Sequence, residues 1–299
     1  MEPCAHTEIA INKLRHQWMA DDGVALIGEE VQAGKDPCVL FAHGFGQTRQ
    51  SWTGAQSALA AEAVGSIAWD MRGHGESARN PDALHYQAEQ FAEDVHLLSR
   101  QFKQKPMLVG ASMGGLTGMM VQARHDVFSA LILVDVTPRW ETAGVARIMA
   151  FMNAFPDGFD SYEHAADIIA NYLPHRRERK SSKQLQFLLR EQDGRLMWHW
   201  DRRMLKEFVE HSEHLQDDIR EAARQIKVPM LLISGGKSDI VSEHTVADFL
   251  QLVPHALHHH LPDATHMVAG DDNDAFNDTL LNFKRTLSQQ PYAVTGVSP

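Results

Sequence analysis

The sequence predicts an α/β protein with a mostly parallel β-sheet that helices cover on both faces. From residue 24 onward, short apolar runs alternate with longer amphipathic stretches. Strands that alternate with helices along the chain are typical of a parallel sheet, which is buried on both faces. The runs that we predict to be strands are Val24–Ile27, Val39–Ala42, Ser66–Trp69, Met107–Val109, Ala130–Val134, Met230–Ile233 and the weaker Leu257–Leu261.

Helical patterns lie between these runs, at residues 57–63, 88–102, 115–124 and 244–252. One interval, from Pro138 to Ile226, contains several helical patterns but no convincing strand. Prolines at both ends of this interval, Pro138 and Pro229, discourage continuation of the neighbouring elements. We therefore predict a core domain formed by residues 1–137 and 227–299, with residues 138–226 inserted as a helical cap.

Composition narrows the class of protein. The 299 residues are 43% hydrophobic and 22% charged, which is typical of a globular protein with a sizeable core. The formal charge of −11 argues against a nucleic-acid partner. The sequence contains no run of 18 apolar residues, so we expect no membrane-spanning helix. Two cysteines exclude a disulfide framework, and the first residues lack a signal-peptide pattern. We expect a cytoplasmic protein with a small-molecule substrate, and a homo-oligomer is left open.

The clearest motif follows the predicted strand Met107–Val109. It reads Gly110-Ala-Ser112-Met-Gly114, a G-x-S-x-G pattern, and small residues open the helical pattern after it. A strand, this pattern and a helix form the context of a nucleophile elbow, in which a serine hydroxyl projects from a tight turn. The N-terminus of the helix adds backbone N–H donors and partial positive charge. We therefore predict that Ser112 is a nucleophile.

A second motif, His43-Gly-Phe45-Gly46, directly follows the predicted strand Val39–Ala42. Its glycines allow the backbone to approach a reacting carbon closely. In such a fold, the backbone N–H groups of Phe45 and Met113 are candidates to bind a developing oxyanion. We expect His43 to make a hydrogen bond that shapes this loop, and it is also a candidate for substrate contact.

A serine nucleophile needs a base, which an acid orients. Among 18 histidines we favour His266, because it follows the last predicted strand and so lies on a loop at the strand ends. The tract His258–His260 resembles a metal site, but neighbouring side chains of a strand point to opposite faces. We expect surface or structural histidines in this tract, with no metal and no cofactor.

Two aspartates are candidates for the acid. Asp239 lies in a glycine-rich loop after the strand Met230–Ile233, and it gives the chain order Ser, Asp, His. Asp135 ends the strand that follows the nucleophile helix, so it is also placed to reach a histidine. We favour Asp239 and retain Asp135 as the alternative.

Taken together, these motifs resemble the serine-dependent form of the α/β-hydrolase superfamily. The matching segments extend from about residue 22 to 287 and also include Asp70–Ser77, Gly235–Asp239 and Thr265-His266. The resemblance implies an eight-stranded, mainly parallel sheet, a helical cap inserted after the sixth strand, and a site between core and cap. It also implies that Asp70 and Arg72 tie down the turn after their strand.

Two departures narrow the chemistry that the resemblance implies. Epoxide hydrolases and haloalkane dehalogenases have aspartate at the elbow, whereas this chain has Ser112, which favours attack on an acyl carbon. Ala111 stands where meta-cleavage carbon–carbon hydrolases usually have asparagine, and this difference weakens the case for cleavage of a carbon–carbon bond. The implied function is hydrolysis of a small ester, lactone or thioester through an acyl-enzyme. A carbon–carbon hydrolase or cofactor-free perhydrolase with the same triad, and a ligand receptor on the same fold, are the alternatives.

Substrate selection is expected to come from the predicted cap. Its aromatic and methionine side chains are candidates to line an apolar pocket, although such residues at helical spacing also pack as core. Arginines near the start of the cap are candidates to meet a substrate carboxylate, with a structural ion pair as the alternative. The residues that we predict to contact substrate are His43, Arg139, Trp140, Phe151, Trp198 and Met267.

Overall fold

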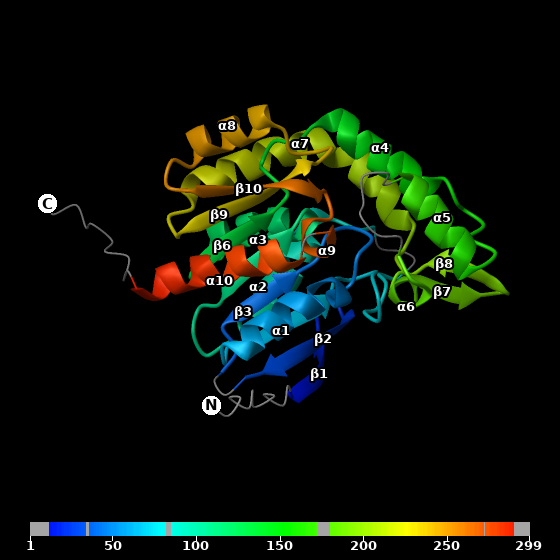
Figure 1. Cartoon of the computed structure of the whole chain (residues 1–299), viewed down its shortest axis with the longest axis horizontal. Helices are drawn as coiled ribbons and strands as arrows, with labels where there is room; N and C mark the ends of the chain where they lie inside the picture. The colour runs from blue at the N-terminus through cyan, green and yellow to red at the C-terminus, as the bar shows by residue number, and fades with distance from the viewer. Residues whose placement is uncertain (1–11, 34–35, 82–84, 173–179, 272, 290–299) are drawn as a thin grey trace, which may run out of the picture.

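The computed structural model describes residues 12–33, 36–81, 85–172, 180–271 and 273–289. An eight-stranded sheet forms its centre, with helices on both faces (Figure 1). The strands of this sheet are β1 (Asn12–Met19), β2 (Ala25–Gln32), β3 (Val39–Ala42), β4 (Ser66–Asp70), β5 (Met107–Ala111), β6 (Ala130–Val134), β9 (Met230–Lys237) and β10 (Leu257–Thr265). The strand order is β1-β2-β4-β3-β5-β6-β9-β10, and β2 alone runs antiparallel to its neighbours in this sheet.

This sheet confirms the predicted fold class, and each of the seven apolar runs overlaps one of its strands. The runs correspond to β2 through β6, β9 and β10. The eighth strand that the resemblance implies is β1, and no apolar run in the sequence predicts it. It lies at the edge of the sheet and six of its eight residues are exposed, so its sequence has no apolar stretch to signal a strand.

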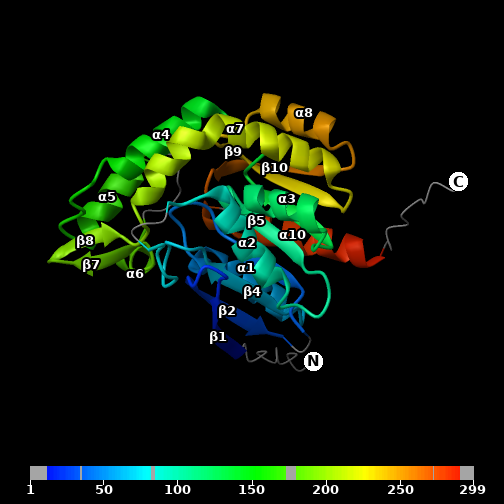
Figure 2. The same cartoon turned by 180° about the vertical axis from the view of Figure 1, so that it is seen from behind.

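Helices on the two faces bury separate hydrophobic clusters. On one face, the short helix η1 (Arg49–Trp52), α1 (Thr53–Ala61), α9 (Val268–Asp271) and α10 (Asn273–Gln289) cover the sheet, with Trp52 and Phe276 in contact at the centre. On the other face, α2 (Ala88–Ser99), α3 (Met113–His125) and α8 (Glu243–Leu252) bury side chains such as Val95 and Phe249 (Figure 2). The parallel strands are therefore buried on both sides, which explains their continuous apolar runs.

The segment between β6 and β9 contains helices and, contrary to the sequence prediction, two strands. Its elements are α4 (Thr142–Asn153), α5 (Tyr162–Tyr172), α6 (Ser182–Leu185), β7 (Leu189–Gln192), β8 (Arg195–Trp198) and α7 (Arg203–Gln225). β7 and β8 form an antiparallel hairpin whose turn residues, Asp193 and Gly194, have φ values of 52° and 74°. Asp-Gly is a favoured pair for such a two-residue turn, so the hairpin did have a sequence signal.

Helix α7 extends from this inserted segment onto the core. It starts directly after the hairpin, while its C-terminal half packs against α3 and α8 and buries Ile219 and Ala223 (Figure 2). The predicted cap boundary at residue 226 lies one residue after the end of α7, but the second half of this helix packs on helices of the core. Among the described residues, no helix combines the length and hydrophobicity needed to cross a bilayer.

A buried network of charges holds the turn after β4. The guanidinium of Arg72 donates to Asp94 at 2.7 Å from Nε and 2.6 Å from Nη2, and to Asp22 at 2.6 Å. The Arg72 side chain is 2% exposed and that of Asp94 is fully buried. Asp70 accepts hydrogen bonds from the backbone N–H groups of Arg49 and Glu76 at 2.8 and 3.0 Å. Asp70 and Arg72 thus make the turn-stabilising contacts that the resemblance implies.

Removal of the buried partner of Arg72 tests this network. We expect Asp94→Ala to lower the free energy of unfolding by about 3–5 kcal/mol, because it leaves a buried guanidinium without one of its carboxylates. The neighbouring variant Glu93→Ala, at an exposed position of α2, should change it by less than about 0.5 kcal/mol. Urea unfolding measures both, and equal losses in the two variants would contradict the assignment.

Candidate active site

Ser112 lies on a strained turn between β5 and α3. Its backbone has φ 46° and ψ −117°, a conformation that non-glycine residues rarely adopt. It is the N-cap residue of α3, and the N–H groups of Gly115 and Leu116 donate to its carbonyl at 2.9 and 3.1 Å. Ser112 therefore lies where the N-terminal end of a helix meets the carboxyl end of a strand, as the G-x-S-x-G pattern predicts.

The two flanking glycines of the motif are required by close backbone contacts. A Cβ on Gly110 would lie 2.6 Å from the backbone of Gly114 and Gly115, and a Cβ on Gly114 would lie 2.4 Å from the carbonyl oxygen of Ala42. Real Cβ atoms do not approach other atoms so closely. The turn that presents Ser112 can thus form only with glycine at both positions.

The loop His43–Gly46 runs beside this turn. Strands β3 and β5 are neighbours, and Ala42 at the end of β3 pairs in register with Gly110. A Cβ on Gly44 would lie 3.2 Å from the Cβ of Ser112. The parallel register therefore places the backbone of residues 43–46 next to the serine, where the sequence predicts it.

The structure pairs His266 with Asp135. His266 Nδ1 lies 2.7 Å from Asp135 Oδ2, and the Asp135 side chain is fully buried. The same carboxylate accepts the N–H of Gly235 at 2.8 Å and the hydroxyl of Ser238 at 2.6 Å. A carboxylate with three donors is well satisfied as an anion. It fixes the tautomer of His266 with the proton on Nδ1, which leaves the Nε2 lone pair as an acceptor.

The preference for Asp239 as the partner of His266 was wrong. Asp239 Oδ1 instead lies 2.9 Å from Arg147 Nη2 of α4. The reason is the tight packing of α4 on the loop after β9: a Cβ on Gly144 would lie 1.9 Å from the carbonyl oxygen of Asp239. This contact sets Asp239 beside the inserted segment, whereas Asp135 directly follows β6 and its carboxylate meets Nδ1 of His266.

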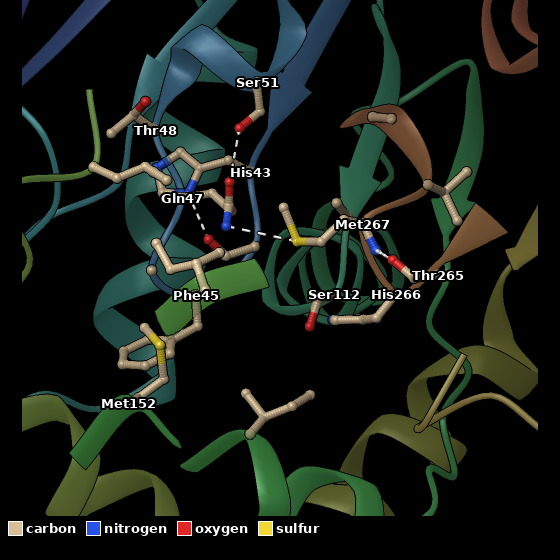
Figure 3. Close-up of a pocket in the computed structure, with 18 of the residues that line it drawn as sticks. His43, Phe45, Gln47, Thr48, Ser51, Ser112, Met152, Thr265, His266 and Met267 are labelled. Carbon is tan, nitrogen blue, oxygen red and sulfur yellow. Dashed lines mark hydrogen bonds between the residues drawn. The ribbon is translucent and has the colours of Figure 1, made fainter. Parts of the chain in front are cut away.

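One cavity of about 870 Å³ brings the predicted site residues together. Figure 3 shows the side chain of Ser112 pointing into this cavity, with His266 on its wall. The predicted residues that line the cavity are His43, Phe45, Ser112, Met113, Phe151, Trp198, Asp239, His266 and Met267. Arg139 and Trp140 are not among the lining residues: Arg139 is exposed elsewhere, and Trp140 is buried in the hydrophobic core.

Two buried imidazoles shape the loop His43–Gly46. His43 donates its Nδ1–H to the carbonyl of Gly44 at 2.8 Å and accepts the N–H of Met71 at Nε2 at 2.9 Å. His74 accepts the N–H of Gly46 at Nε2 at 3.1 Å. His43 thus makes the loop-shaping bond that the sequence predicts, and it also lines the cavity.

A third imidazole, His199, comes from the segment between β6 and β9. Its Nδ1 accepts the N–H of Gly75 at 2.7 Å and its Nε2 lies 3.2 Å from the carbonyl oxygen of Gly46. One ring therefore links the loop beside Ser112 to the turn after β4. Sequence analysis does not identify this link, because His199 follows β8 and no motif surrounds it.

Burial keeps these rings neutral. It lowers the pKa of His43, lowers that of His74 well below the usual value, and lowers that of His199 to about 3. Each ring also uses one nitrogen as an acceptor from a backbone N–H, which a protonated imidazole cannot do.

The histidine tract on β10 has a different arrangement. His258 and His260 share one face of the strand, where Ser234 Oγ lies 2.7 Å from His258 Nε2 and 3.4 Å from His260 Nδ1. Within the described part of the chain, no group of three or more His, Cys, Asp or Glu side chains is arranged to hold a metal ion.

Comparison with known proteins agrees with the α/β-hydrolase resemblance of the sequence motifs. The family model for the alpha/beta hydrolase fold matches residues 37–272. An esterase of Mycobacterium tuberculosis is 28% identical over 251 residues, which cover 80% of this chain and 79% of that protein. An esterase of Escherichia coli is 30% identical over 211 residues, covering 69% of this chain and 77% of that protein.

A similar solved structure is that of an E-2-(acetamidomethylene)succinate hydrolase, with a TM-score of 0.79 and 23% sequence identity. The match covers 92% of this chain and 100% of that one. At this identity the likeness concerns the fold alone.

The neutral His199 predicts a pH dependence of stability. In the unfolded chain its pKa is near 6.5, so between about pH 6.5 and 3 the unfolded state binds more protons than the folded state. Stability should therefore fall as the pH falls through this range. We expect His199→Gln to be less stable than the wild type at about pH 7.5, but to lose less in Tm between about pH 7.5 and 4.5.

The control for this experiment is His244→Gln, at an exposed position of α8. Its Tm should follow that of the wild type at every pH. An equal loss of Tm in wild type and His199→Gln would refute a neutral buried role for His199.

Proposed function

Because the chain belongs to the alpha/beta hydrolase fold family, we propose that it is a serine hydrolase that cleaves a small ester, lactone or thioester through an acyl-enzyme. Its esterase relatives support a hydrolase that acts on esters. One observation carries the serine mechanism: Ser112, on its strained turn, and His266, held by Asp135, line one cavity. These three side chains have the chemistry of a nucleophile, a base and an orienting acid.

In the acylation step, Nε2 of His266 removes the hydroxyl proton of Ser112 as Oγ attacks the carbonyl carbon. The carbonyl oxygen becomes an anion in a tetrahedral intermediate, and Asp135 stabilises the imidazolium that forms. When the intermediate collapses, the bond to the leaving group breaks and the leaving oxygen or sulfur takes the proton from His266. The acyl group stays on Ser112 as an ester.

In the deacylation step, His266 removes a proton from water, and the hydroxide attacks the acyl carbon. The bond to Ser112 Oγ then breaks, and His266 returns the proton to Oγ as the acid leaves. We assign the stabilisation of both tetrahedral anions to the N–H groups of Phe45 and Met113. The closeness of Gly44 to Ser112 and the position of Met113 at the start of α3 support this assignment.

The segment between β6 and β9 acts as the cap in this proposal. Its apolar side chains Phe151, Met152 and Trp198 line the cavity together with Leu116 of the core. Apolar walls favour binding of the hydrocarbon part of an acyl group and exclude water from the reacting carbon.

Replacement of the nucleophile gives the direct test of the mechanism. We expect Ser112→Ala to reduce kcat/KM for 4-nitrophenyl butyrate by at least about 10⁴-fold, because it removes the hydroxyl that forms the acyl-enzyme. The variant should also fail to react with a fluorophosphonate probe. Ser288→Ala, on the exposed face of α10, is the matched control and should keep both properties. Substantial turnover or labelling of Ser112→Ala would overturn the proposal.

The choice of acid is tested by a pair of conservative variants. We expect Asp135→Asn to lower kcat by about 10³- to 10⁴-fold, because an amide in place of the carboxylate neither fixes the His266 tautomer nor stabilises the imidazolium. Asp239→Asn should cost less than about tenfold, since Asp239 pairs with Arg147 instead. The opposite order of losses would show that Asp239 orients the base. Circular dichroism and Tm would establish that both variants are folded.

A further inference from the structure

The charged side chains that line the cavity differ in sign from the rest of the protein. The chain has 28 Lys and Arg residues against 39 Asp and Glu residues. Among the residues that the structure describes, in contrast, the lining contains four cationic side chains, Arg147, Lys180, Lys183 and Lys237, and one carboxylate, that of Asp239.

These cations come from different parts of the fold. Arg147 lies on α4 and Lys183 on α6, both in the segment between β6 and β9, while Lys237 ends β9 in the core. Convergence of cations from separate elements on one cavity is a feature of the tertiary structure rather than of a basic stretch of sequence. Lys180 and Lys183 belong to the inserted segment, whereas Ser112 follows β5 of the core, so the cations and the serine line the cavity from different parts of the fold.

The partners of these cations differ. Arg147 pairs with Asp239 at 2.9 Å, and Lys237 pairs with Asp263 at 3.3 Å. Lys183, which is exposed, forms no ion pair or hydrogen bond with any residue that the structure describes. Its ammonium group is therefore available to a ligand in the cavity.

Neighbouring polar groups add no negative charge. Tyr172 lines the same cavity and stacks on Phe151 with ring centroids 3.9 Å apart. Burial raises the pKa of Tyr172 to about 12, so the phenol stays neutral. Asn171 and Gln184, also in the lining, are neutral hydrogen-bond donors.

We propose that the cavity binds an ester or thioester carrying an anionic group, a carboxylate or a phosphate, at a distance from the scissile bond, and that Lys183 and Arg147 hold this group. The inference rests on the proposed serine-hydrolase function and names its substrate class. Arg147 reaches the anion without leaving Asp239, because a guanidinium has five N–H donors and the carboxylate occupies only part of them. The acidic surface of the protein repels anions at long range, whereas the cavity attracts them once they are within about a Debye length, 8–10 Å.

The test compares substrates that differ only in charge. The first pair is 4-nitrophenyl hydrogen adipate and its neutral methyl ester, which places the anion on the acyl side. The second pair is S-acetyl phosphopantetheine and S-acetyl pantetheine, which places the anion on the leaving group. For each pair the measured quantity is the ratio of kcat/KM for the anionic substrate to that for the neutral one, at low salt. A ratio above one in one pair identifies the side on which the anion sits.

The variants should move this ratio in opposite directions. We expect Lys183→Gln to lower it by about two- to fivefold, the size typical of a solvent-accessible charge pair, and Lys183→Arg to preserve it. Asp239→Asn should raise it by a similar factor, because it removes a carboxylate from the lining and releases Arg147. Lys227→Gln, at an exposed position outside the cavity, should leave it unchanged. Added salt should reduce the wild-type ratio toward one.

The outcomes separate the two proposals. If the wild type cleaves both members of each pair with ratios of one or below, or if Lys183→Gln leaves the ratio unchanged, the anionic specificity is overturned while the hydrolase function stands. If no member is cleaved, the serine-hydrolase proposal fails. Calorimetric binding of monomethyl adipate and of dimethyl adipate to Ser112→Ala then decides the charge preference without turnover, and equal affinities would refute it.

Discussion

The rest of the site depends on the hydrogen bonds that the buried carboxylate of Asp135 accepts. A buried charge without partners would cost several kcal/mol, so the surrounding chain must supply donors. Here they come from the loop after β9, through Gly235 and Ser238, and from the loop after β10, through His266. One side chain therefore fixes the ends of three neighbouring strands, β6, β9 and β10, relative to one another.

The serine turn is attached to the same strand ends. The N–H of Ser112 donates to the carbonyl of Val134 at 3.1 Å, and Val134 directly precedes Asp135. On the other side of β5, the register with β3 brings the loop His43–Gly46 against the serine. The proposed nucleophile Ser112, the proposed base His266 and the proposed oxyanion donors are thus positioned by backbone pairing of adjacent parallel strands, which is rigid and leaves little freedom for the side chains.

The inserted segment is fastened to this arrangement by buried polar contacts. His199 links Gly46 and Gly75, and the N–H of Asp201 donates to the carbonyl of Gly73 at 2.8 Å. Tyr86 of the core donates its hydroxyl to Asp201 at 2.9 Å. The part of the chain that lines the outer cavity and the loop beside Ser112 therefore form one hydrogen-bonded unit. Any movement of the segment about this point would disturb the loop as well, since unpaired buried donors and acceptors are costly.

The sequence by itself determined the fold class, the strands at the centre of the sheet and the position of the serine turn. These features are local: a strand buried on both faces must be apolar throughout, and the turn at Ser112 requires glycine at Gly110 and Gly114 within two residues. The edge strand β1 and the hairpin β7–β8 were missed, because exposed or partly exposed strands have no continuous apolar run.

Only the tertiary structure decided which acid meets His266, because Asp135 and Asp239 both follow strands and sequence spacing does not reveal where a loop turns. The packing of α4 on the Asp239 loop settles it, and that contact joins residues about a hundred positions apart. The role of His199 and the convergence of cations on the cavity have the same origin. Each depends on where distant segments come to lie against one another, and that is set by packing of the whole chain rather than by any local pattern.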